Sequence, residues 1–334
     1  MKVSIKSISE KTGFSPATVS NALNHKKGVN AETAAEIFRV ARELGYISEI
    51  RISKVKFVIF RGSGKIIDNS PFLSAMIDGV EKGCRQFGLE MTICNLSKHD
   101  ITYREDVERL IHDSASAVIF LGTELMEEDV GLYKGADCPF VMLDYWAWDM
   151  SFNGVLINNK DSAGKAVEYL IEKGHREIGY LRGDFRIKAF RSREMGYEFA
   201  LKNAGIPVKN EYIVTLGTDM NTAYRGMTDF LKKRPKLPTA YYVDNDMIAI
   251  GAMRALQESG YRIPEDVSLI GFDNLPFSEI CFPPLTTIDV PNKEMGLLAV
   301  KRVVDVIKGD KIKTKMQVCT SFIERSSVLD RREM

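Results

Sequence analysis

Short apolar runs alternate with amphipathic stretches from residue 55 to the carboxyl end, and this alternation limits the possible folds more than any other feature. Runs typical of strands lie at 55–60, 89–95, 116–122, 140–144, 177–183, 239–244 and 267–273. Helical periodicity follows several of them, for example over 72–87, 160–173, 192–204 and 245–259. Strands separated by helices predict parallel sheets with crossover connections. The chain holds enough such units for an α/β core with two doubly wound lobes.

The first 46 residues show helical spacing instead of strands. Gly13 can adopt a positive φ between two helices, Ser15 can cap the second helix, and Pro16 suits its first position. On this second helix the apolar stripe is formed by Val19, Leu23 and, at its edge, Ala22. The opposite face carries short polar side chains, which can approach DNA bases and phosphates. Alone, the stretch also fits a short helix of any small helical domain.

Flanking signals favour a helix-turn-helix unit. A first helix is opened by Ser4 or Ser7, and a third follows Asn30 and ends at Gly45. Three short helices with a glycine turn between the first two are typical of this DNA-binding motif.

The stretches ATVSNALN, GVNAET and ARELGY closely resemble the headpiece of the lactose and galactose repressor family of bacterial transcription regulators. In that family the second helix enters the DNA major groove. The resemblance implies operator DNA as a partner, a homodimer, and contacts from Ser7, Pro16, Ala17, Thr18, Ser20, Asn21, Asn24 and His25. We expect Ala17 and Asn21 to face bases, and Thr18, Ser20 and Asn24 to lie nearer the backbone.

The resemblance extends through the core, which in this family is similar to a periplasmic sugar-binding protein. It implies a headpiece at 1–46, a linker at 47–54, a first lobe at 55–157 plus about 287–314, and a second lobe at 158–286 plus about 315–330. The segment 283–291 is expected to cross between the lobes. In most members this linker is longer and forms a hinge helix with a Pro-Asn start and an Ala and a Leu. The linker of this chain has none of these features. It is either a simple connection or a DNA contact through Ile50 or Ile52, with Arg51 on a phosphate.

Ligands of open α/β sheets bind beyond the carboxyl ends of the strands, and this rule indicates the loops that end in Phe72 and contain Trp146 and Trp148. The tryptophans either stack on a sugar or close a hydrophobic lid. The family resemblance adds four candidates. Together the predicted effector-binding residues are Phe72, Trp146, Arg193, Met220, Asn245 and Asp273.

The candidates from the resemblance have alternatives. Arg193 could be a surface ion-pairing residue instead of a ligand contact, and Asp246 is a possible cap of the helix that begins there. Met220 takes a position where relatives often carry an aromatic ring.

The net charge of +1 conceals an uneven distribution. Residues 1–54 hold nine Lys or Arg and five Asp or Glu, which gives the headpiece a net charge of +4 suited to DNA. We expect the five cysteines to be reduced core thiols because they lack metal-binding spacing. Without an export signal or an apolar stretch long enough for a membrane span, the protein is expected in the cytoplasm, with no membrane partner.

Signals for an enzyme are weak. GSGK at 62–65 follows a strand, but it lacks the third glycine of a dinucleotide fingerprint and the Ser or Thr of a P-loop. We therefore expect no cofactor, no metal and no catalysis. The prediction is a DNA-binding regulator that is controlled by a sugar-like effector, and the family resemblance implies a repressor. Its rivals are a stand-alone sugar-binding protein and an enzyme on a doubly wound scaffold.

Overall fold

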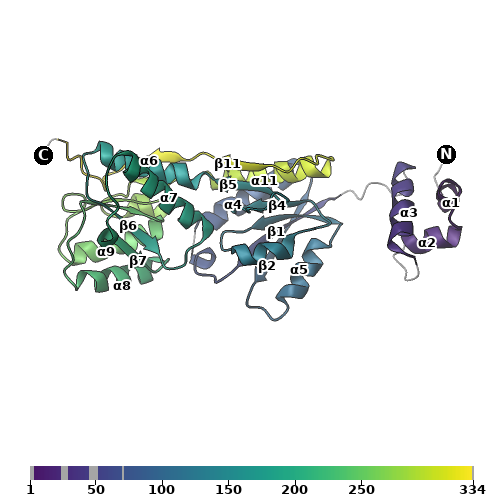
Figure 1. The fold of residues 1–334 in the computed structure, drawn as a ribbon, viewed down its shortest axis with the longest axis horizontal. Helices are drawn as coiled ribbons and strands as arrows, with labels where there is room; N and C mark the ends of the chain where they lie inside the picture. Colours follow the sequence, from purple (N-terminus) through teal and green to yellow (C-terminus); the bar gives the residue numbers. More distant parts are fainter. Residues whose placement is uncertain (1–3, 24–28, 45–51, 70, 333–334) are drawn as a thin grey trace. The chain divides into compact units, whose positions relative to one another are not determined.

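The computed structural model describes residues 4–23, 29–44, 52–69 and 71–332 (Figure 1). The chain divides into two compact units, Met1–Ser53 and Lys54–Met334. Five sequence-based expectations lie outside the described residues: those for Asn24, His25, Gly45, Ile50 and Arg51.

The amino-terminal unit contains α1 (Ile5–Thr12), α2 (Pro16–Leu23) and α3 (Ala31–Glu43). Ser4 caps α1 in a capping box with Ser7, and Gly13 ends that helix with a φ of 75°. The backbone N–H of Thr18 donates to Ser15 Oγ at 3.1 Å, so the expected cap of α2 is present.

The headpiece core lies where the three helices meet. Its buried side chains are Ile8, Val19, Ala22, Ile37, Val40 and Ala41. Leu23 is only partly buried, so the inward stripe of α2 runs through Val19 and Ala22 and places Leu23 at the edge.

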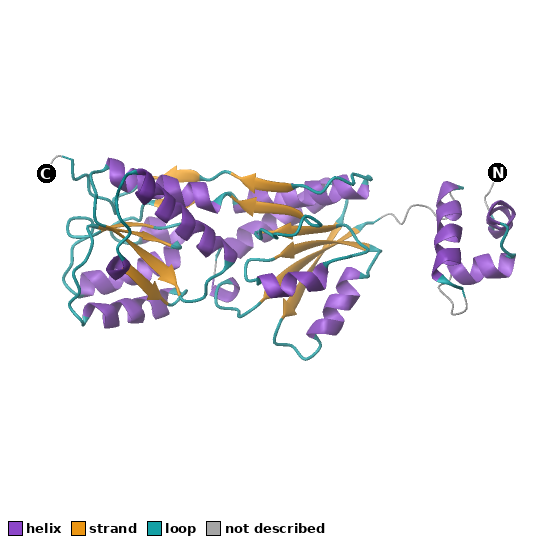
Figure 2. Ribbon diagram, in the orientation of Figure 1, coloured by secondary structure: helices purple, strands orange, loops and turns teal. Residues whose placement is uncertain are grey.

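The first lobe is built on a parallel sheet with the order β11-β5-β4-β3-β1-β2 in the described chain. Its strands are β1 (Lys54–Arg61), β2 (Glu90–Ser97), β3 (Ser116–Leu121), β4 (Phe140–Leu143), β5 (Asn153–Ile157) and β11 (Lys315–Val318). The helical elements are α4 (Phe72–Gln86), α5 (Tyr103–Ile111), α11 (Asn292–Ile307) and the 3-10 turns η1 (Ile67–Asn69) and η2 (Glu127–Tyr133). Figure 2 shows helices on both faces of the sheet.

The second lobe has a parallel sheet of order β7-β6-β8-β9, again within the described chain. Its strands are β6 (Ile178–Gly183), β7 (Ile213–Leu216), β8 (Ala240–Val243) and β9 (Ser268–Ile270). Its helices are α6 (Asn159–Glu172), α7 (Lys188–Asn203), α8 (Met220–Leu231), α9 (Asp246–Glu258) and α10 (Pro276–Ile280), with the turn η3 at Asn210–Tyr212. Helix α7 begins at Lys188, four residues before the expected start at Ser192, so the segment just before Ser192 is helical as well.

The chain returns to the first lobe through β10 (Thr287–Asp289), and α11 then packs against α4 (Figure 1). The expectation that the strand region after residue 314 belongs to the second lobe is wrong for β11. Met316 pairs with Val155 of β5, so β11 extends the first sheet. The chain crosses back only afterwards, where β12 (Ser321–Ile323) pairs antiparallel with β10. A short polar-apolar run fits either sheet edge, so its sequence does not decide between them.

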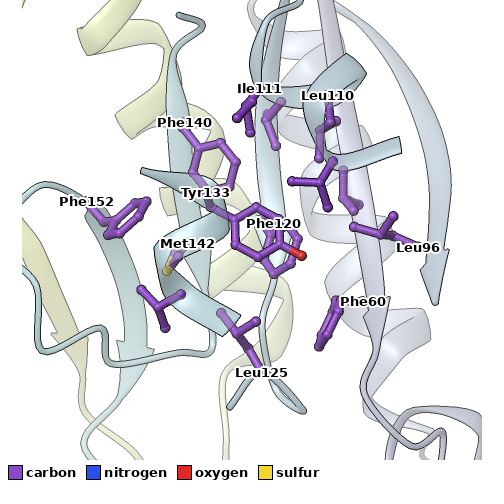
Figure 3. Close-up of a cluster of buried hydrophobic side chains, with 14 of the residues drawn as sticks. Phe60, Leu96, Leu110, Ile111, Phe120, Leu125, Tyr133, Phe140, Met142 and Phe152 are labelled. Atoms are coloured by element: carbon purple, nitrogen blue, oxygen red, sulfur yellow. The ribbon is translucent and has the colours of Figure 1, made fainter. Parts of the chain in front are cut away.

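The core of the first lobe is a cluster of aromatic and aliphatic side chains (Figure 3). Phe120 of β3 lies at its centre, with the ring of Tyr133 at 4.5 Å and that of Phe60 at 5.6 Å between centroids. Tyr133 is fully buried, and its hydroxyl shares a hydrogen bond of 3.0 Å with Tyr103. This packing fixes the strands whose carboxyl ends face the second lobe.

The five cysteines are free thiols, as expected. The expectation of core positions holds for Cys84 and Cys138, which are buried, but is wrong for Cys319, which is exposed.

Candidate functional site

The exposed face of α2 is the candidate DNA-binding surface of the headpiece. Pro16, Ala17 and Asn21 are exposed, while Thr18 and Ser20 are half-buried. Burial of Val19 and Ala22 holds the helix on the domain and turns these side chains outward. The hydroxyl of Ser7, another predicted contact, takes part in the capping box of α1.

In the second unit, the carboxyl ends of strands from both lobes border a small inner cavity of about 20 Å³. It is lined by Ile66, Phe72, Met76, Thr123, Asp144, Ile157, Ile187, Ala189, Phe190, Arg193, Asn245, Asp273 and Asn292. Four of the predicted effector residues are therefore brought together here: Phe72, Arg193, Asn245 and Asp273. The cavity lies at the carboxyl ends of the strands, where the strand-end rule predicts a ligand site.

Asp144 supplies the cavity with an unused hydrogen-bond acceptor. It follows β4 directly, at a φ of 58°, and is buried. Thr123 donates to its Oδ2 at 2.7 Å, but Oδ1 has no hydrogen-bond partner among the described residues. Burial raises the pKa of Asp144 to about 6, against the lowering effect of the Thr123 hydrogen bond. A ligand that donates a hydrogen bond would satisfy this oxygen.

Arg193 is buried, so the surface ion-pairing alternative does not hold. Its guanidinium donates to Asn159 Oδ1 at 2.8 Å, to the carbonyl of Asp244, and to Asp273 Oδ1 at 3.2 Å. It also lies 3.5 Å from the ring centroid of Phe272. Arg193 therefore joins α6 to the segments that follow β8 and β9, and it positions Asp273.

Asp273 has a φ of 107°, which L-residues rarely adopt. Burial raises its pKa to about 6, and the nearby Arg193 opposes that rise. Two carboxyl groups of raised pKa, Asp144 and Asp273, thus line the same cavity.

Asn245, and not Asp246, caps α9. The backbone N–H of Ile248 donates to Asn245 Oδ1 at 2.9 Å. Asp246 is fully buried and accepts hydrogen bonds from the N–H of Leu275 and the hydroxyl of Thr287. Asp246 therefore fixes the loop after β9, which carries Asp273.

A larger outer pocket of about 480 Å³ shares Asp144, Ile157 and Ala189 with the inner cavity. Trp146 and Trp148 line it, the latter 76% exposed. Trp146 thus lies beside the other predicted effector residues, whereas Met220, at the start of α8, lines neither space.

The GSGK loop after β1 resembles a phosphate cradle, but a side chain of the protein occupies it. The N–H groups of Ser63 and Gly64 donate to Glu124 Oε2 at 2.7 Å, and those of Ile66 and Ile67 donate to Oε1 at 2.7 and 3.0 Å. Glu124 is fully buried. The loop thus binds an internal carboxylate in place of a phosphate.

The lobes contact each other beside the cavity. Ile66 of the first lobe packs with Ile187 and Phe190 of the second. Lys65 Nζ lies 3.5 Å from Asp184 Oδ2, and Lys188 Nζ lies 3.4 Å from Glu127 Oε2. These contacts hold the pocket between the two sheets.

Sequence reasoning missed Asp144, Thr123 and Asn292 as cavity residues. Asp144 had a usable signal, since it ends a predicted strand and precedes the tryptophan loop. Asn292 had none, because its place depends on the return of α11 to the first lobe. Among the described residues, no group of three His, Cys, Asp or Glu side chains is arranged to hold a metal ion. The same part of the chain holds no helix of the length and apolarity that crossing a membrane requires.

The chain is similar to known regulators over nearly its whole length. The profile of bacterial regulatory proteins, lacI family, matches residues 4–49, and that of a periplasmic binding protein-like domain matches residues 167–328. The HTH-type transcriptional repressor PurR of Vibrio vulnificus (strain CMCP6) is 32% identical over 307 residues, covering 91% of this chain and 92% of the relative. PurR of Actinobacillus pleuropneumoniae serotype 3 (strain JL03) is 29% identical, covering 94% of both chains.

Two solved structures share the fold. The complex of the transcriptional regulator CelR with cellobiose has a TM-score of 0.74 and 24% identity, covering 97% of this chain and 99% of that one. The Lac repressor dimer bound to operator and the anti-inducer ONPF has a TM-score of 0.72 and 24% identity, covering 98% and 100%. This chain belongs to the lacI family of bacterial regulatory proteins: it is a transcriptional regulator with a helix-turn-helix DNA-binding domain and a periplasmic-binding-protein-like effector domain.

Proposed function

We propose that the protein is a homodimeric repressor whose α2 helices read two halves of a near-palindromic operator. A carbohydrate-like effector binds in the pocket between the lobes and changes operator affinity. The observation that carries the proposal is the buried Oδ1 of Asp144 in that pocket, which has no partner among the described residues, in the same chain as the exposed face of α2.

The exposed face of α2 suits base contacts. An Asn side chain such as Asn21 can form two hydrogen bonds to adenine, and the methyl group of Ala17 can contact thymine. Two such helices, about one turn of DNA apart, require two subunits. The headpiece charge of +4 favours approach to phosphates.

The inner cavity suits hydroxyl groups. Asp144 and Asp273 accept hydrogen bonds, while Arg193 already donates to protein atoms. Tryptophan rings at the outer pocket can cover the apolar face of a sugar. The related structure of CelR contains cellobiose, which agrees with this class of ligand.

Coupling between the sites follows from differential binding. An effector that contacts both lobes favours the arrangement in which Ile66 packs on Ile187 and Phe190. Because β1 directly follows the linker, a change in lobe arrangement reaches the headpiece through the first lobe.

The test is a fluorescence anisotropy titration of the full chain against DNA from upstream of its own gene, with and without a panel of sugars. We expect preference over random duplex and a shift of apparent Kd with one class of sugar. Sugar binding without DNA preference would favour the stand-alone sugar-binding protein. A monomer in light scattering at working concentrations would contradict the dimer.

Asn21→Ala separates the two sites. We expect at least a roughly thirtyfold loss of operator affinity, because a homodimer loses two base contacts of about 1–3 kcal/mol each, and unchanged sugar affinity. The control Ala35→Ser alters an exposed residue of α3 and should leave both unchanged. If Asn21→Ala and Ala35→Ser bind the operator equally well, the proposal that α2 contacts the bases through Asn21 is wrong.

A further inference from the structure

The outer pocket differs from the inner cavity in charge. The inner cavity is bordered by Asp144 and Asp273, and its one cation, among the described residues that line it, is Arg193. The outer pocket is lined by three cations, Lys160, Lys188 and Arg191, from α6 and α7. The charge of the lining therefore changes sign along the path from the inner to the outer end.

The outer cations are incompletely neutralised. Arg191 is exposed and forms no ion pair or side-chain hydrogen bond with the described residues. Lys160 lies 4.9 Å from the ring centroid of Phe199, with no carboxylate partner in the described chain. Lys188 Nζ lies 3.4 Å from Glu127 Oε2, and Glu127 is its one ion-pair partner among the described residues.

Apart from Asp144, which the two spaces share, the acid that follows the tryptophans is already paired. Asp149, which follows the tryptophans, lies 2.5 Å from Lys134. Lys315 Nζ donates to the carbonyl of Asp149 at 2.7 Å and lies 5.1 Å from the ring centroid of Trp146, which adds a further positive charge beside the pocket. An anion entering here would meet several cations and few carboxylates.

The size of the outer pocket calls for more than one sugar ring. About 480 Å³ lies within the range of roughly 300–1,000 Å³ typical of small-molecule pockets, whereas the inner cavity holds about 20 Å³. Trp146 and Trp148 offer ring faces, and Ser192 and Gln317 offer hydrogen bonds. A ligand that contacts Asp144 must extend outward past these residues.

We infer that the effector is an acidic disaccharide or longer glycoside. Its neutral inner end places a hydroxyl group against Asp144, and a carboxylate or phosphate at its outer end lies against Arg191, Lys160 and Lys188. This inference rests on the proposed sugar-binding function. Arginine suits either anion because its planar fork donates two parallel hydrogen bonds.

The experiment is isothermal titration calorimetry of the full chain at pH 7.5 with matched probes. Each set contains a neutral disaccharide, its counterpart oxidised to a uronate at the outer ring, and its counterpart phosphorylated there, in gluco and galacto configuration. We expect an acidic member to bind about tenfold more tightly than its neutral match, with the difference shrinking as salt rises. The uronate and phosphate arms identify the anion.

Variants assign the preference to the outer cations. Arg191→Gln and Lys160→Gln should reduce the preference to below about threefold, because each variant weakens binding of the acidic member more than that of its neutral match. The control Lys165→Gln removes an exposed lysine of the same helix as Lys160, one that pairs with Glu168, and should retain the full preference.

The outcomes separate the two proposals. Equal affinity for neutral and acidic members, unchanged by Arg191→Gln, overturns the acidic effector and leaves the sugar-binding function intact. Binding of no probe at all overturns both. Both proposals are supported if the parent protein prefers the acidic member and Asp144→Asn binds none of the sugars.

Discussion

Asp144 and Arg193 lie in the same cavity but differ in how many of their polar atoms are already bonded. The guanidinium of Arg193 donates to three protein oxygens, whereas one carboxylate oxygen of Asp144 has no partner among the described residues. Arg193 is therefore a positioning residue for Asp273, and Asp144 is the group left open for a ligand. A buried acceptor without a partner lowers stability until a ligand donates to it.

Asp144→Asn should stabilise the ligand-free protein at neutral pH. A pKa raised from 3.8 to about 6 means that the folded state holds its proton more tightly, so the parent loses stability as pH rises through that range. The gap in unfolding free energy between variant and parent should grow by up to about 3 kcal/mol from pH 4 to pH 7.5. Asn also tolerates the positive φ. Urea unfolding at both pH values measures the gap.

Asp149→Asn is the control of opposite sign. Hydrogen bonds from Lys134 and Ser151 hold the pKa of Asp149 well below its usual range. The variant should be less stable than the parent at pH 7.5, and the gap should close as the pH falls through the carboxyl range. If the difference in unfolding free energy between Asp144→Asn and the parent does not change with pH, Asp144 is not a buried carboxyl group of raised pKa.

Glu124→Gln tests the internal carboxylate in the loop after β1. Gln replaces one acceptor oxygen with a donor that faces N–H groups, so we expect a loss of about 3 kcal/mol in unfolding free energy. Glu198→Gln, an exposed change on α7, should shift stability by less than about 0.5 kcal/mol. Similar midpoints for the two variants in urea would show that the loop does not depend on Glu124.

At the scale of elements, helices approach closely where glycines face a neighbouring backbone. A Cβ added at Gly79 of α4 would lie 2.0 Å from the carbonyl oxygen of Lys293, and one at Gly296 of α11 would lie 2.7 Å from that of Met76. The spacing of α4 and α11 therefore depends on the absence of side chains at both positions.

Gly79→Ala should separate α4 from α11 and lower the unfolding free energy by about 1–3 kcal/mol, because the contact is with backbone that cannot rotate away. The control Gly131→Ala has open space around the new methyl group and should be nearly neutral. Thermal unfolding of both variants gives the comparison. A neutral Gly79→Ala would mean that the two helices tolerate a wider spacing.

Secondary structure was predictable where a pattern is local. The Ser15 cap, the turn at Gly13 and the runs that form β1 to β4, β6, β8 and β9 depend on neighbouring residues along the chain. The strands β5 and β7 were not among the expected runs. The pairing of β11 with β5 was not predictable from the sequence. Which sheet a four-residue strand joins depends on the strand that packs beside it in three dimensions, and its own residues do not specify that neighbour.

At the scale of the whole molecule, the headpiece and the core are separate compact units. A chain shortened to 54–334 should therefore fold, bind effector with a Kd within about twofold of the full protein, and lose preference for operator DNA. Circular dichroism and calorimetry check folding and binding. Loss of effector binding in a folded shortened chain would show that the headpiece contributes to the pocket.

The amino-acid sequence by itself determined the helix-turn-helix unit and the alternating α/β core. It also indicated which loops at strand ends border the pocket. These features follow from periodicity, caps and turns, which act over a few residues. Tertiary structure alone decided that Glu124 fills the loop of Ser63 and Gly64, that Arg193 donates to three protein oxygens, and that Met220 lies outside the pocket. It also decided that one oxygen of Asp144 has no partner among the described residues. Whether a polar atom is left for a ligand depends on which distant groups reach it, and packing in three dimensions sets those distances.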